Sequence, residues 1–319
     1  MNGTRSADAA LRRLLHGRPR ADDRRLAGAV AGRTVLVTGA SSGVGRQVAR
    51  RLATAGARVL VTARSAGRLE ILVREIAAEG GSAAAFPADL TDPAAVAALA
   101  AWVEDEQGGV DALVNNAGHS LWRSFALTEF RPTDSVRMTE VNHLGPLRLT
   151  LALLPGMRAR GGGRIVGVCS IAALLPTLPR MAAYVAAKSA FDTWLRGLAT
   201  EVRGDGVRVV SVYLGVTRTR MTSATPWLRR VRPLSATDAA GLVCDALVYR
   251  RTSIGPWWRR GVQALGPFLR GSTEALLARW YARTADTPAA RLVSRGTDRP
   301  VTAAAATRRP ASGRAAEGR

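Results

Sequence analysis

Continuous apolar segments alternate with helical patterns through the middle of the chain. Apolar strands are predicted at residues 34–38, 58–62, 83–86, 111–114, 164–169 and 207–213. Apolar residues recur at helical spacing in 44–55, 69–78, 93–106, 140–160, 181–202 and 235–249. Strands that are apolar throughout are typical of a parallel sheet covered by helices on both faces. The pattern therefore predicts one doubly wound α/β domain over about residues 33–255.

Capping residues mark two of the predicted helix starts. Asp92 precedes Pro93, which suits an N-cap followed by proline in the first turn. Ser235 and Asp238 have the spacing of a capping box.

The segments outside this domain have a different composition. Residues 1–32 are basic and rich in alanine, and we expect a loose extension with a short helix near residues 9–15. Residues 256–283 combine tryptophan, leucine and arginine at helical spacing. Residues 284–319 hold few large apolar side chains, and we expect them to be disordered.

The charge is strongly positive and comes almost entirely from arginine. The formal net charge is +22, most of the excess lies outside the middle of the chain, and Lys188 is the only lysine. A coding bias that replaces lysine by arginine, at positions where either residue is tolerated, explains the abundance of arginine. Arginine and lysine differ where a compact, titratable amine is needed. A single remaining lysine is therefore a candidate for chemistry.

The composition also excludes several classes of protein. With 47% hydrophobic residues the chain is too apolar to be wholly disordered. Two cysteines, Cys169 and Cys244, cannot form a disulfide framework. We find no apolar run long enough to span a membrane and no secretory signal. No metal-ligand pattern stands out, so we expect no metal.

The first predicted strand leads into a glycine-rich turn. Glycines let the backbone turn tightly and approach a pyrophosphate, while the N–H groups of the next helix point at the anion. Its place between the first strand and the first helix favours a dinucleotide-binding turn over a flexible loop. The candidate residues are Thr38, Gly39, Ser41, Ser42, Gly43, Val44 and Gly45.

The residue after the second strand distinguishes two cofactors. An acidic residue there binds a ribose 2′-hydroxyl, whereas an arginine accommodates a 2′-phosphate. The chain has Arg64 and no acid until Glu70. We therefore expect NADP(H), with an accidental arginine as the alternative in so arginine-rich a chain.

Tyr184 and Lys188 lie four residues apart in a predicted helix, and therefore on one face. Free tyrosine titrates near ~10, too high for easy proton transfer at neutral pH. A nearby ammonium lowers that pKa, which would make Tyr184 a usable general acid. The alternative is a surface tyrosine beside a solvated lysine, which leaves unexplained why the only lysine lies there.

These residues, with the Asn115-Asn116-Ala117-Gly118 stretch after the fourth strand, resemble the short-chain dehydrogenase/reductase family. The family's T-G-x-x-x-G-x-G turn matches residues 38–45, and its Y-x-x-x-K pair matches Tyr184 and Lys188. The likeness covers about residues 33–221 and implies a Rossmann fold with oxidoreductase activity.

The resemblance also implies roles for single residues. Ser170 would hydrogen-bond the substrate carbonyl, and Tyr184 would protonate it while the nicotinamide delivers hydride. Lys188 would bind the nicotinamide ribose as well, and Asn142 would hold a water that relays protons to it. Further cofactor contacts are implied for Asp89, Leu90, Asn116, Ala117, Gly118, Gly215 and Thr219.

Two departures from the family pattern affect these assignments. Ser170 lies fourteen residues before Tyr184 where the family has thirteen, so the loop over residues 172–180 carries one extra residue. Cys169 is the alternative to Ser170. The usual Pro-Gly after the sixth strand reads Leu214-Gly215, which leaves the nicotinamide contacts near Thr219 open.

Two segments resemble a narrower branch of the family, the actinobacterial fatty acyl-CoA reductases and long-chain keto-lipid reductases. The segments are residues 115–157 and 219–292, with Thr225-Pro226 and Pro233-Leu234-Ser235 as marks. This second resemblance implies an apolar, lipid-derived substrate with a ketone, aldehyde or acyl thioester group.

The Trp/Arg-rich segment over residues 256–283 has two interpretations. One is an amphipathic surface that contacts an anionic membrane from the cytoplasmic side. The other is ordinary packing of its aromatic residues over the substrate cleft or on a partner subunit, the family being commonly homo-oligomeric.

Three functional hypotheses follow. The first is a cytoplasmic, NADPH-dependent carbonyl reductase, and the second is a catalytically silent NADP-binding sensor or scaffold of the same fold. The third, a nucleic-acid binder, has only the net charge in its favour, because no nucleic-acid motif is found. We therefore expect a small-molecule or lipid substrate and no nucleic-acid partner.

Overall fold

The structure is a computed structural model that describes residues 15–128, 131, 133–175, 178–223 and 233–286. In these residues seven parallel strands form one sheet, in the order β3-β2-β1-β4-β5-β6-β7. The first six strands and their order confirm the predicted doubly wound sheet. The strands are β1 (Thr34–Thr38), β2 (Arg58–Ala63), β3 (Ser82–Pro87), β4 (Ala112–Asn115), β5 (Gly163–Ser170), β6 (Val207–Leu214) and β7 (Ser253–Ile254).

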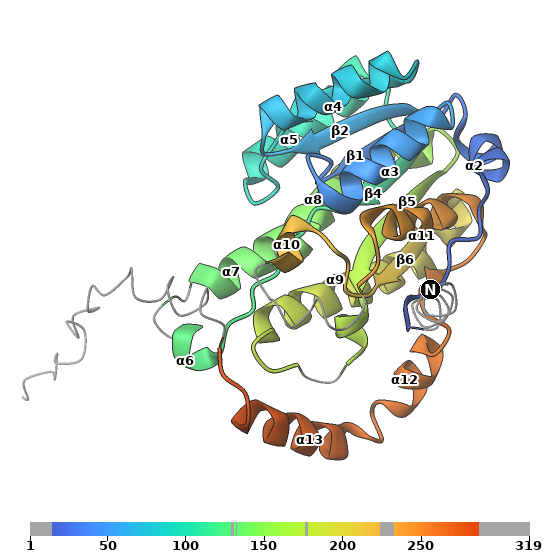
Figure 1. Cartoon of the computed structure of the whole chain (residues 1–319). Coiled ribbons are helices and arrows are strands. Elements are labelled where there is room, and N and C mark those ends of the chain that lie inside the picture. Colours follow the sequence, from blue (N-terminus) through green and yellow to red (C-terminus); the bar gives the residue numbers. More distant parts are fainter. Residues whose placement is uncertain (1–14, 129–130, 132, 176–177, 224–232, 287–319) are drawn as a thin grey trace, which may run out of the picture.

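Helices cover both faces of the sheet because the strands send apolar side chains to both (Figure 1). In β1, Val35 and Val37 point into one core while Leu36 points into the other, as the period of two requires. The first core lies under α2 (Asp23–Val30), α3 (Gly43–Thr54), α4 (Ala66–Ala78) and α11 (Ala236–Val248). The second lies under α5 (Pro93–Ala101), α8 (Gly145–Ala159) and α9 (Ala182–Glu201).

The capping residues act as predicted. The Asp92 carboxylate accepts a hydrogen bond from the backbone N–H of Ala94 at 2.9 Å. The Ser235 hydroxyl accepts one from the N–H of Asp238, also at 2.9 Å. Both helices therefore begin where the sequence indicates.

The helix predicted over residues 140–160 begins earlier and contains a wider turn. It runs from α7 (Thr133–Thr139) through the π-helical turn η2 (Glu140–Leu144) into α8. Such turns are rare and concentrate at functional sites. The remaining short elements are η1 (Trp102–Glu106), α6 (Phe125–Thr128), η3 (Ile171–Leu174), η4 (Val202–Asp205) and α10 (Arg220–Ser223).

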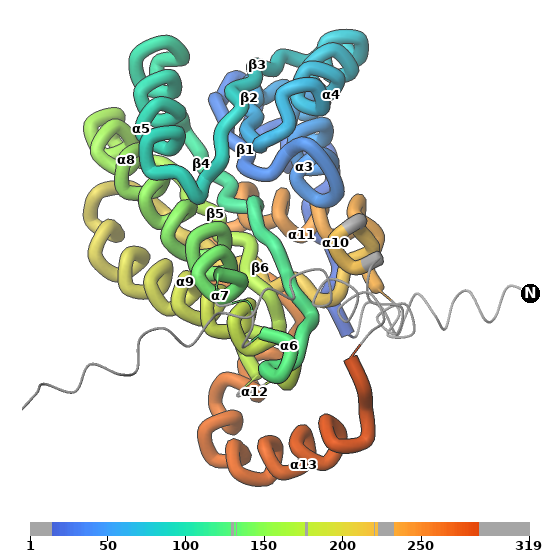
Figure 2. Tube along the Cα trace, turned by 90° about the vertical axis from the view of Figure 1, so that its left-hand side faces the viewer, coloured from blue at the N-terminus to red at the C-terminus, as the bar shows by residue number. Residues whose placement is uncertain are grey.

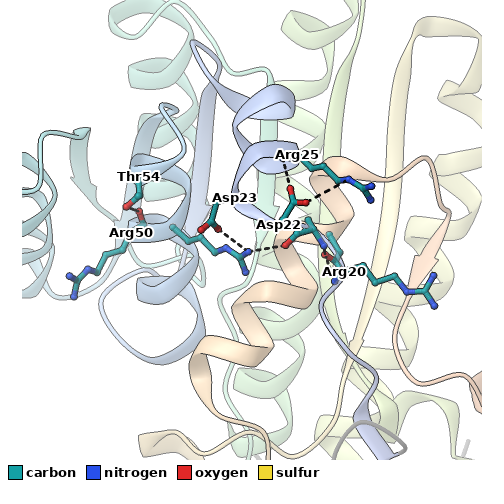
Figure 3. Close-up of polar contacts among 9 residues, drawn as sticks. Arg20, Asp22, Asp23, Arg25, Arg50 and Thr54 are labelled. Atoms are coloured by element: carbon teal, nitrogen blue, oxygen red, sulfur yellow. Dashed lines mark hydrogen bonds and ion pairs between the residues drawn. The ribbon is translucent and has the colours of Figure 1, made fainter.

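The N-terminal segment is not loose where the structure describes it, so that expectation was wrong for residues 15–31. Leu26 and Val30 of α2 are fully buried against α3 and α11. The Asp245 carboxylate of α11 accepts hydrogen bonds from the backbone N–H groups of Arg20 and Ala21 at 2.8–3.1 Å. Figure 3 shows the polar contacts of this segment. One of them is the hydrogen bond that the Asp22 carboxylate accepts from the backbone N–H of Arg25. The helix expected near residues 9–15 lies almost wholly outside the described residues.

The predicted C-terminal helical segment forms an arm, defined here as residues 255–286. It contains α12 (Arg259–Leu265) and α13 (Arg270–Ala282), which extend away from the sheet in both views (Figures 1 and 2). No helix among the described residues is long and apolar enough to cross a membrane.

The far end of the arm returns to the domain through Arg180. The side chain of Arg180 is buried, it donates hydrogen bonds to Thr284 at 2.7 and 2.9 Å, and it pairs with Asp286 at 3.3 Å. Its guanidinium also lies 4.4 Å from the ring centre of Tyr281. The disorder expected from residue 284 onward is therefore wrong for 284–286, because these residues pair with a buried cation.

Arg180→Met should release the end of the arm. The variant leaves Asp286 without its cation, and breaking a buried pair costs about 3 kcal/mol. We expect hydrogen exchange across α13 to accelerate by roughly 100-fold, which that free energy corresponds to. Arg279→Met, an exposed site on the same helix, should leave exchange unchanged. Equal exchange in both variants would show that Arg180 does not hold the arm.

Candidate active site

The predicted site residues come from separate strands whose carboxyl ends share one edge of the sheet. Thr38 ends β1, Asn115 ends β4 and Ser170 ends β5. Ligands of doubly wound sheets bind at this edge. The parallel topology therefore brings together residues as far apart in the sequence as Thr38 and Ser170.

Thr38 and Asn116 join the first and fourth strands. The Thr38 hydroxyl accepts hydrogen bonds from the N–H groups of Asn116 and Ala117 at 3.0 and 2.9 Å, and donates to the Val114 carbonyl at 3.3 Å. The Asn116 side chain donates to the Thr38 carbonyl at 2.9 Å. These bonds fix the glycine-rich turn against the stretch after β4.

The close approach of these two segments explains why the turn needs glycine. Gly39 has φ +68°, and a Cβ there would lie 2.8 Å from the Cα of Ala117. A Cβ at Gly45 would lie 2.4 Å from the Asn116 side-chain nitrogen. Any side chain at either position would push the turn away from β4.

The turn delivers the start of α3 to the sheet edge. Ser42 is the N-cap of α3, and its side chain makes no capping hydrogen bond. The first N–H groups of the helix are thus left to other acceptors. A Cβ at Gly43 would lie 3.2 Å from a Thr219 methyl, so Thr219 adjoins the turn. The other candidate residues of the turn, Ser41 and Val44, flank this opening and are partly exposed.

Arg64 and Asp89 face each other beside the turn. Arg64 follows β2, and its guanidinium lies 3.9 Å from the Asp89 carboxylate that follows β3. The Asp89 carboxylate also accepts hydrogen bonds from the N–H and hydroxyl of Thr91 at 3.0 and 2.9 Å. The Arg64 side chain remains 63% exposed, so it keeps room for an anionic group. Leu90, next to Asp89, is buried.

Helix α9 presents Tyr184 and Lys188 on its sheet-facing side. Lys188 is only 5% exposed, and its ammonium donates a hydrogen bond to the Val168 carbonyl in β5 at 2.9 Å. An ammonium has three donors, so two remain for other acceptors. The contact explains how a lysine is accommodated at a buried position.

Ser170, and not Cys169, lies next to Tyr184. Neighbouring residues in a strand point to opposite faces. Interaction with Ser170 lowers the pKa of Tyr184, whereas the Cys169 thiol points to the buried Asp192 carboxylate, 3.8 Å away. Burial raises the pKa of Cys169 to about 12, which keeps it a thiol. The extra residue in the loop thus leaves Ser170 at the end of β5, facing Tyr184.

The expected lowering of the Tyr184 pKa was wrong for this structure. Burial raises the pKa of Tyr184, and the hydrogen bond with Ser170 offsets this only in part. Burial likewise lowers the pKa of Lys188. Desolvation, which disfavours the charged form of each group, is the largest cause of both shifts.

Asn142 lies in the π-helical turn η2 and is fully buried. Its amide nitrogen donates to the carbonyls of His119 and Met138 at 2.8 and 3.0 Å, and its oxygen accepts from the His119 N–H at 3.2 Å. A Cβ at Gly118 would lie 2.9 Å from the Asn142 oxygen and 3.4 Å from the Lys188 nitrogen. Only glycine therefore fits between Asn142 and Lys188.

Three partners of the site were not predicted. The Val168 carbonyl and the His119 backbone are main-chain groups, which carry no sequence signal. His16 lies against Gly215, where a Cβ would be 2.0 Å from its ring nitrogen. That contact gives Gly215 a packing reason to be glycine, independent of any cofactor.

A pocket of about 320 Å³ lies away from this chemistry, between α7 and α9. Ala182 and Ala186 line it, and both lie about half a turn from Tyr184 on α9. Ala183, next to Tyr184 in the chain, also lines it, but none of Asn142, Ser170, Tyr184 and Lys188 does. No cluster of three metal-ligating side chains occurs among the residues that the structure describes.

This chain is similar to known oxidoreductases in sequence and in fold. The chain matches the family model of short chain dehydrogenases over residues 33–227. It is 40% identical to an uncharacterized oxidoreductase of Mycobacterium tuberculosis over 71% of this chain and 67% of that protein. It is also 40% identical to a fatty acyl-CoA reductase of Acinetobacter baylyi, over 69% and 75% of the two chains.

A solved structure of a metagenomic short-chain oxidoreductase in complex with NADP is similar as well. The sequence identity is 32%, the TM-score is 0.60, and the match covers 69% of this chain and 92% of the other. The family match, the sheet order and the shared edge of the strands agree with one another. The chain belongs to the short-chain dehydrogenase/reductase family.

Proposed function

We propose that this protein is an NADPH-dependent reductase that acts on the carbonyl group of an apolar, lipid-derived substrate. The observation that carries the proposal is the convergence of Ser170, Tyr184 and Lys188 beside the glycine-rich turn. Oxidoreductase relatives and an NADP-bound structural neighbour support the reaction class.

The residues at the sheet edge suit a dinucleotide. The uncapped start of α3 offers N–H groups to a pyrophosphate, and the glycines allow it to approach. Arg64 would hold a 2′-phosphate, because it stands after β2 where an NAD-binding protein carries an acid. Asp89, Leu90, Asn116, Ala117 and Gly118 would border the adenosine and ribose portions, and Gly215 and Thr219 would border the nicotinamide.

The proton is the part of the reaction that this chain supplies. Burial raises the pKa of Tyr184, so its hydroxyl holds a proton at neutral pH, and donation of that proton to the substrate oxygen depends on a neighbouring cation that stabilises the phenolate. Ser170 would donate a hydrogen bond to the same oxygen. When bound, the reduced nicotinamide supplies the hydride that reaches the carbonyl carbon. A ketone or aldehyde thus becomes an alcohol with one hydride and one proton added, whereas an acyl thioester becomes a hemithioacetal that releases the thiol and leaves an aldehyde.

Lys188 and Asn142 would support Tyr184. The Lys188 ammonium stabilises the phenolate left after proton transfer, and its two remaining donors can bind ribose hydroxyls. The Asn142 side chain is already bonded to His119 and Met138. A relay water would therefore donate a hydrogen bond to the main-chain carbonyl of Asn142 or to the remaining lone pair of the Asn142 side-chain oxygen.

The substrate class follows from the relatives and from the surroundings of the site. A fatty acyl-CoA reductase is 40% identical to this chain, and α12 of the arm lies beside η3, the turn after Ser170. We further propose a cytoplasmic homo-oligomer whose arm makes peripheral contact with the inner membrane face.

Tyr184→Phe and Lys188→Arg should each lower the rate of NADPH oxidation by roughly 10²–10⁴-fold with the fold intact. Phenylalanine has no proton to give, and the planar guanidinium of arginine does not fit a buried ammonium site. Steady-state rates and circular dichroism would be compared with Tyr249→Phe, a tyrosine remote from the site.

The substrates for this test are aldehydes, β-keto acyl thioesters and acyl-CoAs of increasing chain length. We expect activity to rise with chain length. A preference for short polar ketones would refute the proposed lipid substrate but would leave the proposed reductase activity in place. Full activity in either variant would refute the mechanism, and NADPH binding without turnover on the whole panel would favour the silent sensor.

Arg64→Ala should weaken NADPH binding roughly tenfold, because a charged hydrogen bond to the 2′-phosphate is lost. Binding of NADH, which lacks this phosphate, should not change. Arg68→Ala, at an exposed position in the first turn of α4, is the matched control. Titration of nucleotide fluorescence measures all three proteins, and an equal loss for NADH and NADPH would contradict the assignment.

A further inference from the structure

The arm is attached to the domain at both ends, and the junction of its two helices lies between these attachments. At its start, the Arg259 side chain is buried and donates to the carbonyls of Pro256 and Ser253 at 3.1 Å. The Gln263 side chain donates to the Tyr213 hydroxyl of β6 at 3.4 Å. At its far end, Arg180 binds Thr284 and Asp286. The two attachments leave the junction of α12 and α13 to project.

The projecting junction carries large apolar side chains that nothing in the described structure covers. Phe268 is 86% exposed, and Leu265 and Leu269 are 57% and 54% exposed. We call these three residues the arm tip. Trp257 at 70% and Leu276 at 67% extend the apolar surface to either side. Exposed apolar surface of this kind, held on short helices, usually marks a binding surface.

The charge around the arm tip is positive. Arg260 and Arg270 flank the tip in the sequence, Arg279 lies further along α13 and Arg283 directly follows that helix, all of them exposed. The two acids of the arm are both paired, Glu274 with Arg270 at 2.8 Å and Asp286 with Arg180. Apolar side chains bordered by arginine suit the interface of an anionic bilayer, where each cation adds about fivefold in affinity.

We propose that the arm tip inserts into the surface of an anionic lipid bilayer, with Arg260 and Arg270 on the headgroups. This inference rests on the proposed function and specifies how the protein reaches its lipid-derived substrate. The arm joins the catalytic region twice, since α12 packs on η3 directly after Ser170 and Arg180 lies four residues before Tyr184. A membrane-bound arm thus places lipid beside the site.

The test measures binding of the full-length protein to vesicles of phosphatidylcholine with 30% phosphatidylglycerol, using sedimentation. The double variant Phe268→Asp/Leu269→Asp should bind the vesicles roughly 10- to 100-fold more weakly, since two apolar anchors are lost and two anions are added. Arg260→Ala/Arg270→Ala should weaken it by tenfold or more, and binding to vesicles of phosphatidylcholine alone should be weak for every variant.

Ile71→Asp is the matched control, because Ile71 is an apolar residue 44% exposed on α4, outside the arm. It should bind vesicles as the wild type does. Failure of the wild type to bind anionic vesicles, or equal binding by the tip variant and Ile71→Asp, would overturn the proposal. Reduction of a short water-soluble aldehyde should be unchanged in the tip variant, so loss of membrane binding can be separated from failure of the proposed function.

A second copy of the chain is the competing occupant of the tip. Light scattering after size exclusion would distinguish it. The proposal predicts the same mass for the wild type and for Phe268→Asp/Leu269→Asp. A halved mass in the variant together with unchanged vesicle binding would assign the tip to a subunit interface and overturn the membrane assignment.

Discussion

The hydrogen bond from the Lys188 ammonium to the Val168 carbonyl is the contact on which the site depends. A buried ammonium is costly unless it is hydrogen-bonded, so this bond fixes the register of α9 against the end of β5. The helix then places Tyr184 one turn before Lys188, where it meets Ser170. An arginine at this position could not make the same compact contact, which accounts for the single lysine in a chain otherwise supplied with arginine.

A second set of contacts brings the nucleotide-binding turn to the same edge. The Thr38 hydroxyl and the Asn116 amide bond β1 to the segment after β4, and glycine at positions 39 and 45 lets the two backbones touch. Gly118, two residues further, leaves the space between Asn142 and Lys188. One short stretch of chain thus contacts both the turn and Lys188, so packing sets how far the turn lies from Lys188.

The sequence predicted the sheet, and it singled out the candidate site residues, because both rest on local patterns. Continuous apolar strands, the glycine turn and the i, i+4 pair at Tyr184 are visible without knowing the fold. The errors concern contacts that span the chain. Asp245 binds backbone 225 residues away, which makes the N-terminal segment part of the core. Arg180 binds Thr284 across 104 residues and orders the end of the arm. Neither pairing has a sequence signal, and the pKa of Tyr184 depends on burial that spacing does not reveal.

The central claim is that hydride reaches a carbonyl carbon while Tyr184 protonates the oxygen. Transfer of deuterium from NADPH labelled at the nicotinamide C4 tests it most directly. With a long-chain aldehyde, the account predicts one deuterium on the carbinol carbon of the alcohol product, formed by the wild type and nearly absent with Tyr184→Phe. Unlabelled alcohol, or equal labelling by both proteins, would contradict it.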